Sequence, residues 1–185
     1  MAWQVAGVTV VEHENRRDKA ISHFPSEVEQ VCKDIAGFFK CAGPDKDKAR
    51  ARAVDALPGP SALRVLLRAV AETGDERRSV WFNEYRLLAP GAVAALAKRV
   101  GATSRGLIPF AENIDEDLLA CGEDEHRGGV FSLGADGKPQ GDELAPCLAT
   151  FLEGYRDALL SRKLEFIDGC GMVARAVPAR RGAPC

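Results

Sequence analysis

Three short apolar runs lie close together in the second half of the chain, at residues 106–110, 118–121 and 130–133. Turn-forming residues separate them, and an Asp136-Gly137 pair follows the last run. Short apolar runs divided by such turns are typical of antiparallel hairpins. The pattern therefore predicts an antiparallel meander, and this meander restricts how the rest of the chain can fold.

Amphipathic segments lie on both sides of the predicted meander. In residues 26–41, apolar side chains recur at helical spacing after a serine and a glutamate placed as in a capping box. The same kind of apolar stripe predicts helices over residues 61–70, 90–100 and 148–159. Residues 45–53 are charged and small, and their pattern fits either a continued helix or a mobile link.

Four further runs resemble strands, at residues 3–11, 79–88, 164–167 and 172–177. Helices, strands and a closing helix in this order predict an α+β fold, with a mainly antiparallel, twisted sheet covered on one side by helices. A length of 185 residues fits one domain.

Within this domain we expect three parts. Residues 1–56 form an N-terminal extension whose helix, 26–41, packs on the domain. Residues 57–160 form the α+β core, and residues 161–185 form a C-terminal extension that frays at its end.

Six cysteines are spread along the chain without a Cys-x-x-Cys pair, and the three histidines do not cluster with them. We therefore predict no structural metal site and expect reduced, mostly buried cysteines. Phosphate-loop and dinucleotide-binding glycine motifs are absent from the sequence, so no cofactor is predicted. No apolar run approaches the length of a bilayer, and the first residues do not resemble a signal peptide, so we expect a cytoplasmic protein without membrane insertion.

Charge is concentrated in one region, because residues 111–157 carry twelve acidic and only three basic side chains. The densest part holds the candidate site residues, which are Glu112, Asp115, Glu116, Asp117, Glu123, Asp124 and Glu125. Such a group repels a phosphate backbone and argues against nucleic acid as a partner.

The acidic stretch has three possible interpretations: a solvated loop, a cation site, or a contact surface for a basic partner. A calcium loop needs a glycine at a fixed offset, and residues 115–117 lack it, which argues against a metal. Because the acids flank the predicted strand 118–121, a sheet edge would present them rigidly and steer a basic protein.

Several motifs recur in a fixed order between residues 57 and 155. They are Leu57-Pro58 before an amphipathic helix, Tyr85-Arg86-Leu87-Leu88-Ala89-Pro90 before a short helix, the strand-like Leu107-Ile108-Pro109-Phe110-Ala111, the run Gly129-Val130-Phe131-Ser132-Leu133, and the closing helix from Leu148 to Tyr155. In this order they resemble the SUKH superfamily, whose founders are fungal cell-wall and killer-toxin-resistance regulators. The resemblance covers about 100 residues and implies a non-catalytic recognition module, such as a bacterial immunity protein that neutralises a toxin, or an adaptor.

These sequence features lead to three alternative hypotheses for the function. The first is a non-enzymatic module that binds another, possibly basic, protein through residues 112–125. The second is an accessory subunit of a large complex, with the two extensions as docking segments. The third is a cysteine-dependent hydrolase using Cys170 or Cys121, which is disfavoured because no histidine follows Cys170 and its surroundings lack the strand-turn-helix context of a nucleophile turn.

Overall fold

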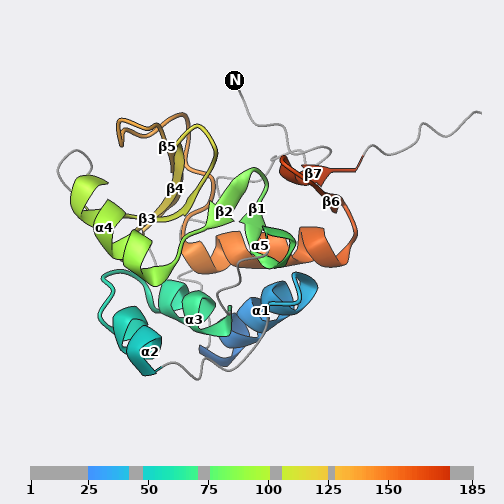
Figure 1. Cartoon of the computed structure of the whole chain (residues 1–185), viewed down its shortest axis with the longest axis horizontal. Helices are drawn as coiled ribbons and strands as arrows, with labels where there is room; N and C mark the ends of the chain where they lie inside the picture. Colours follow the sequence, from blue (N-terminus) through green and yellow to red (C-terminus); the bar gives the residue numbers. More distant parts are fainter. Residues whose placement is uncertain (1–24, 42–47, 71–75, 101–105, 125–127, 176–185) are drawn as a thin grey trace, which may run out of the picture.

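The meander predicted from the three apolar runs is the centre of the fold. The computed structural model describes residues 25–41, 48–70, 76–100, 106–124 and 128–175. Within these ranges one antiparallel sheet has its strands in chain order: β1 (Trp81–Phe82), β2 (Tyr85–Leu87), β3 (Leu107–Glu112), β4 (Leu118–Gly122) and β5 (Val130–Leu133). The three runs are β3, β4 and β5, so this prediction is confirmed (Figure 1).

The predicted amphipathic helices are also present in this α+β domain. They are α1 (Pro25–Phe38), α3 (Ser61–Ala69), α4 (Pro90–Val100) and α5 (Leu148–Leu160). The segment left open between helix and link contains a separate helix, α2 (Lys48–Asp55). The elements are completed by the short η1 (Glu76–Arg78) and by a second, two-stranded sheet of β6 (Leu164–Ile167) and β7 (Gly171–Ala174).

The start of α1 differs from the capping-box prediction. The helix begins at Pro25, where proline is favoured because its missing N–H would have no partner within the helix. Ser26 is therefore inside the first turn and is not the N-cap. The Glu29 carboxylate forms an ion pair with Lys33 at 2.6 Å, one turn further along.

The run 79–88 was expected to form one strand, and the structure divides it into a hairpin. Phe82 pairs with Tyr85, and Asn83 between them adopts a left-handed backbone with φ of 57°. Asparagine tolerates this conformation better than most residues, which lets the chain reverse within two residues. The correction places Glu84 at a tight turn and not inside a strand.

Helices cover both faces of the sheet, and not one face as expected. Residues of β4 alternate between two apolar clusters: Leu119 and Cys121 face the core shared with α1, α3 and α5. Leu118 and Ala120 instead pack with Val100 of α4. Because both faces are covered, every residue of β4 is buried.

A proline occupies the interior of β3, where a missing N–H would normally break the ladder. The register of β3 against β4 shifts between Pro109 and Ala111, which marks a bulge. On the other side of β3, the Phe110 carbonyl accepts a hydrogen bond from the backbone N–H of Leu88 at 2.9 Å, which continues the pairing with β2. Proline is tolerated here because the ladder is already interrupted.

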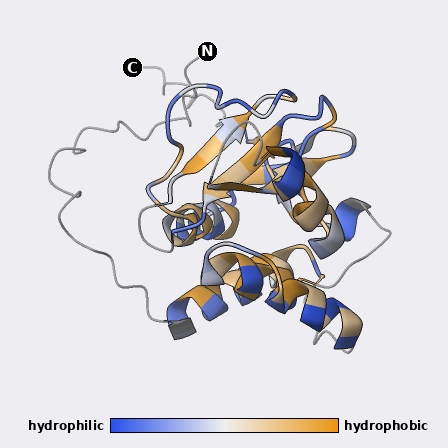
Figure 2. Ribbon diagram, turned by 90° about the vertical axis from the view of Figure 1, so that its left-hand side faces the viewer, coloured by the Kyte–Doolittle hydropathy of each residue, from blue (hydrophilic) through white to orange (hydrophobic). Residues whose placement is uncertain are grey.

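An aromatic cluster joins the sheet to α5. The Phe82 ring lies 5.0 Å from Tyr155 and 5.6 Å from both Phe110 and Phe151, measured between ring centroids. The Tyr155 hydroxyl donates to the Trp81 carbonyl. In Figure 2 the strands are largely orange, while the helices carry bands of orange and blue, as expected of amphipathic elements.

The segments on either side of residues 57–160 contribute to the same structure. Ile35 of α1 and Val54 of α2 are fully buried in the main core. The β6–β7 pair contacts β1, because the Met172 N–H donates to the Asn83 carbonyl at 2.8 Å and Phe166 packs on Trp81. The predicted strand at 3–11 and the end of the tail lie outside the described residues.

Candidate interaction surface

The turn between β3 and β4 has a fixed geometry. The side-chain Oδ1 of Asn113 accepts hydrogen bonds from the backbone N–H groups of Asp115 at 3.0 Å and Asp117 at 2.9 Å. The Asn113 N–H donates to the Asp117 carbonyl at 3.0 Å, which closes the loop. Glu116 completes the reversal with φ of 63°. This turn therefore holds its backbone in a defined conformation.

The tip of the turn carries an exposed isoleucine. Ile114 is 93% exposed, far more than any other large apolar side chain of the described residues, the next being Leu160 at 60%. It stands directly between Asn113 and Asp115. Ile114 was not among the predicted site residues, and the sequence signal for it is an isolated apolar residue inside an acidic turn.

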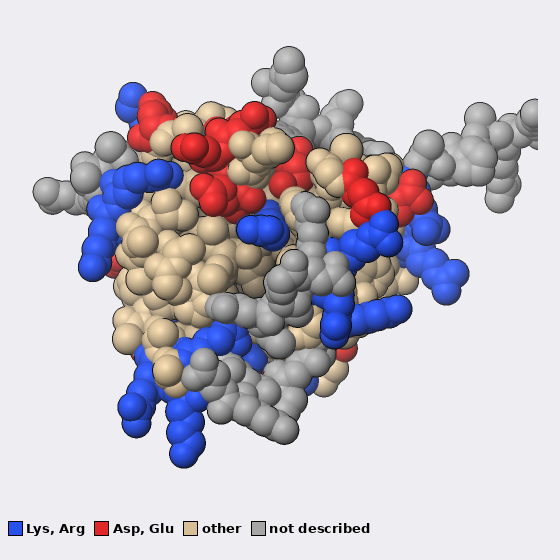
Figure 3. All heavy atoms as spheres, in the orientation of Figure 1, with Lys and Arg blue, Asp and Glu red and all other residues tan. Residues whose placement is uncertain are grey.

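A second hairpin brings another carboxylate to this turn. Glu84 lies at the β1–β2 turn, and its pKa is raised by partial burial and then by the negative charges of Asp117 and Asp115. The two turns therefore share one negative field, although Glu84 is distant in sequence. Figure 3 shows acidic side chains gathered at this end of the sheet.

The predicted acidic residues fall into two groups. Glu112 pairs with Leu118 at one end of the β3–β4 ladder, and Asp115, Glu116 and Asp117 continue from that end. Glu123 and Asp124 follow the opposite end of β4, which is separated by a strand of about 17 Å. Glu125 lies outside the described residues.

The two thiols named in the cysteine-hydrolase alternative lie in different environments. Cys121 is fully buried, and burial raises its pKa to about 12, so almost no thiolate is present near neutral pH. Its Sγ lies 3.7 Å from the Ile108 carbonyl oxygen. Cys170 is exposed on the β6–β7 turn. All three histidines of the chain lie outside the described residues.

Among the residues that the structure places, no group of three or more His, Cys, Asp or Glu side chains could hold a metal ion. No helix in that part of the chain is long and apolar enough to cross a membrane. No protein-family model matches the sequence, and no curated protein matches it.

Proposed function

We propose that this protein is a non-catalytic recognition module of the SUKH type, which binds another protein through the β3–β4 turn. The contact surface comprises Ile114 and the acids around it, Glu84, Asp115, Glu116 and Asp117. Its partner is a basic protein, and the module acts as a toxin-neutralising immunity protein or as an adaptor.

The positions of the family-like motifs support this proposal. Leu57-Pro58 lies two residues ahead of α3, and the run 85–90 leads from β2 into the first residue of α4. The run 107–111 lies in β3, and the closing motif begins α5. These four motifs thus lie at the kind of element that the resemblance implies for them.

The observation that carries the proposed surface is Ile114 on its fixed turn. Covering a fully exposed isoleucine removes apolar area from water and is worth about 1.5–3 kcal/mol. Because Asn113 already orders the turn, binding loses little additional conformational entropy. The surrounding carboxylates attract a positively charged partner at long range and set its orientation.

A capture experiment with the full chain tests this function. A tagged bait is incubated in native lysate at about 0.1 M salt, and the bound proteins are identified. We expect one stoichiometric basic protein, which the Ile114→Ala bait and the triple bait Asp115→Asn, Glu116→Gln, Asp117→Asn no longer retain. The purified partner should then bind the purified bait directly.

A matched control carries the same loss of negative charge on the helices. Glu29→Gln, Asp34→Asn and Asp157→Asn remove three acids from α1 and α5. This bait should keep the partner. A partner that all baits retain equally would exclude the β3–β4 turn as its binding surface.

The immunity version adds a sharper requirement. A neutralising protein should inhibit its cognate toxin at nanomolar concentration, which corresponds to a binding free energy of about −12 kcal/mol. Binding without inhibition would favour the adaptor version instead.

A further inference from the structure

The β1–β2 turn, Asn83-Glu84, lies beside the β3–β4 turn that carries Ile114. Arg86 of β2 pairs with Glu112, the last residue of β3, so the turn before β2 and the turn after β3 leave the sheet at the same end. The place of Glu84 in the proposed contact surface therefore depends on how this two-residue turn is held.

The β6–β7 hairpin holds the peptide group that leads into Glu84, and Figure 1 shows this hairpin beside β1 and β2. The Met172 N–H donates to the Asn83 carbonyl at 2.8 Å. The Asn83 carbonyl and the Glu84 N–H belong to one planar peptide unit, so a bond that fixes the carbonyl also fixes the direction of the N–H. The left-handed backbone of Asn83, with φ of 57°, is a conformation that asparagine adopts but does not prefer. The bond from Met172 therefore helps to select it.

Gly171 allows the hairpin to come this close to the turn. A Cβ added at this position would collide with the Asn83 carbonyl oxygen, and its φ of 78° also favours glycine. Gly169 of the same hairpin has a similar φ of 76°, but a Cβ added there would meet no atom of the described residues within 4 Å. The two glycines thus share a backbone conformation and differ in their contact with the β1–β2 turn.

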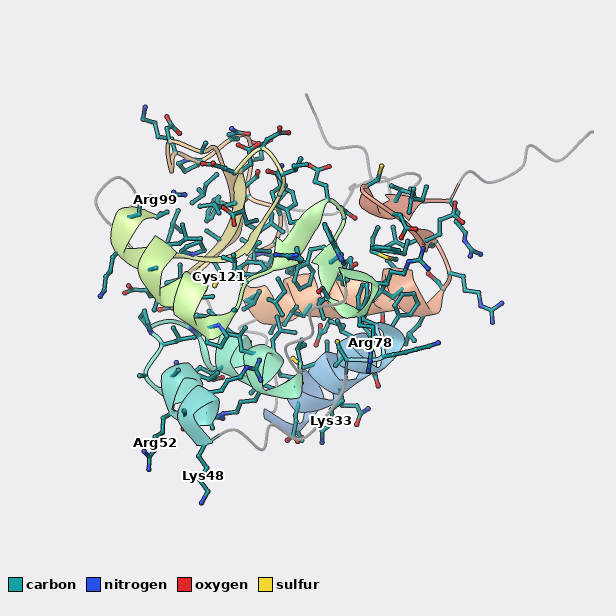
Figure 4. The ribbon with its side chains drawn as sticks, in the orientation of Figure 1. Lys33, Lys48, Arg52, Arg78, Arg99 and Cys121 are labelled. Atoms are coloured by element: carbon teal, nitrogen blue, oxygen red, sulfur yellow. The ribbon has the colours of Figure 1, made fainter. Side chains whose placement is uncertain are left out.

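Side-chain contacts attach the hairpin to the folded core at other points. The rings of Phe166 and Trp81 pack with their centroids 6.1 Å apart. Nε of Arg77, in η1, donates to Oδ1 of Asp168 at 2.9 Å. Arg78, the next residue of η1, donates to a backbone carbonyl just after α1 at 3.0 Å, and Figure 4 shows it beside α1. The hairpin is therefore anchored independently of the turn that it contacts.

We propose that the β6–β7 hairpin is a positioning element of the recognition surface. Through Gly171 and Met172 it holds the β1–β2 turn, so that Glu84 stays beside the Ile114 turn. This inference rests on the proposed function, and it gives the C-terminal segment a role in recognition that needs no contact of its own with the partner. A partner that pairs a cation with Glu84 then requires an intact hairpin.

The titration of Glu84 reports its position without knowledge of the natural partner. Carbon-detected NMR of the full chain follows the Glu84 carboxyl as the pH changes, and Glu84→Gln assigns its signal. Partial burial and the charges of Asp117 and Asp115 raise the pKa of Glu84, so a turn that moves out into water lowers it. Gly171→Ala should therefore lower the Glu84 titration midpoint by about 0.3 pH units or more.

Matched variants separate positioning from stability. Gly169→Ala adds the same methyl group to the same hairpin, and it should change the Glu84 midpoint by less than about 0.1 pH units. Phe166→Ala with Asp168→Asn loosens the hairpin without a new collision and should lower the midpoint as well. This double variant decides the question if Gly171→Ala does not fold. Glu165→Gln removes an acid from the same hairpin without touching either anchor, and it should leave the midpoint unchanged.

A lysine hexapeptide then relates this position to recognition. At about 20 mM salt it should shift the amide signals of Glu84 and of residues 114–117 in the wild-type protein and in Gly169→Ala. In Gly171→Ala the response of Glu84 should fall by about half or more, while residues 114–117 still respond.

Two outcomes count against different parts of the account. An unchanged Glu84 midpoint in Gly171→Ala would overturn the positioning role, provided that faster hydrogen–deuterium exchange of the Met172 amide shows its bond to be broken. The proposed surface would then stand without the hairpin. Absence of any response of residues 114–117 to the peptide in the wild-type protein would instead contradict the proposed function.

Discussion

Replacing Ile35 by alanine tests whether α1 is part of the folded core or a separable extension. The Ile35 side chain is fully buried, in the cluster that also contains residues of α3, α5 and the sheet. If α1 is integral, the substitution must destabilise the whole domain. If α1 is peripheral, it melts alone and the rest of the domain is unaffected.

The expected cost follows from the burial of Ile35. The change removes three buried carbons, each worth about 0.8 kcal/mol of transfer free energy. The cavity left behind adds to this sum, and isoleucine-to-alanine changes in cores cost about 2–5 kcal/mol. Alanine's higher helix propensity returns about 0.4 kcal/mol. We therefore expect the free energy of unfolding to fall by about 3 kcal/mol.

Urea denaturation followed by tryptophan fluorescence and by far-UV circular dichroism measures this change. With a slope of about 2 kcal/mol per molar urea, the midpoint should fall by about 1.5 M for both probes together. Lys33→Ala, an exposed position of the same helix, should change the midpoint by less than about 0.3 M. A loss below about 1 kcal/mol for Ile35→Ala, or separate transitions for the two probes, would refute an integral α1.

Three further outcomes are expected. Gly171→Ala should lower the free energy of unfolding by more than about 2 kcal/mol and detach β7 from β1, since a Cβ at this left-handed position would collide with the Asn83 carbonyl. Unchanged hydrogen–deuterium exchange of the β7 amides would contradict this. Iodoacetamide near pH 8 should label the exposed Cys170 and spare Cys121 until the protein unfolds, as read by peptide mass mapping. Glu84→Gln should stabilise the protein at pH 7, because the raised pKa makes the ionised Glu84 unfavourable in the folded state. That gain should vanish below about pH 4, where the carboxyl is protonated in both states, and a gain that persists there would point to another cause.

Helices and strands whose apolar side chains recur at a clear spacing could be predicted from the sequence. The apolar stripe of residues 148–159 and the short runs of the meander report burial directly, and the structure has a helix and strands there. The β1–β2 hairpin could not be predicted in the same way. Its reversal depends on the left-handed Asn83, and the following glutamate gives no turn signal of the Asn-Gly kind.

The sequence also does not show which distant segments pack against one another. The five buried residues of β4 include both alternating sets, but the sequence does not show that α4 returns to cover the second face. Likewise, the acids between 112 and 125 are close in sequence, although β4 holds them at opposite ends of the ladder. Glu84 joins one group only through the pairing of hairpins, which sequence spacing does not reveal.

The rate constants of partner binding test the proposed recognition surface most directly. With the purified partner, we predict that neutralising Asp115, Glu116 and Asp117 lowers the association rate constant and removes most of its salt dependence. Ile114→Ala should instead raise the dissociation rate constant by about tenfold or more and leave association nearly unchanged. If both variants associate and dissociate like the wild-type protein, the β3–β4 turn is not the surface through which this protein recognises its partner.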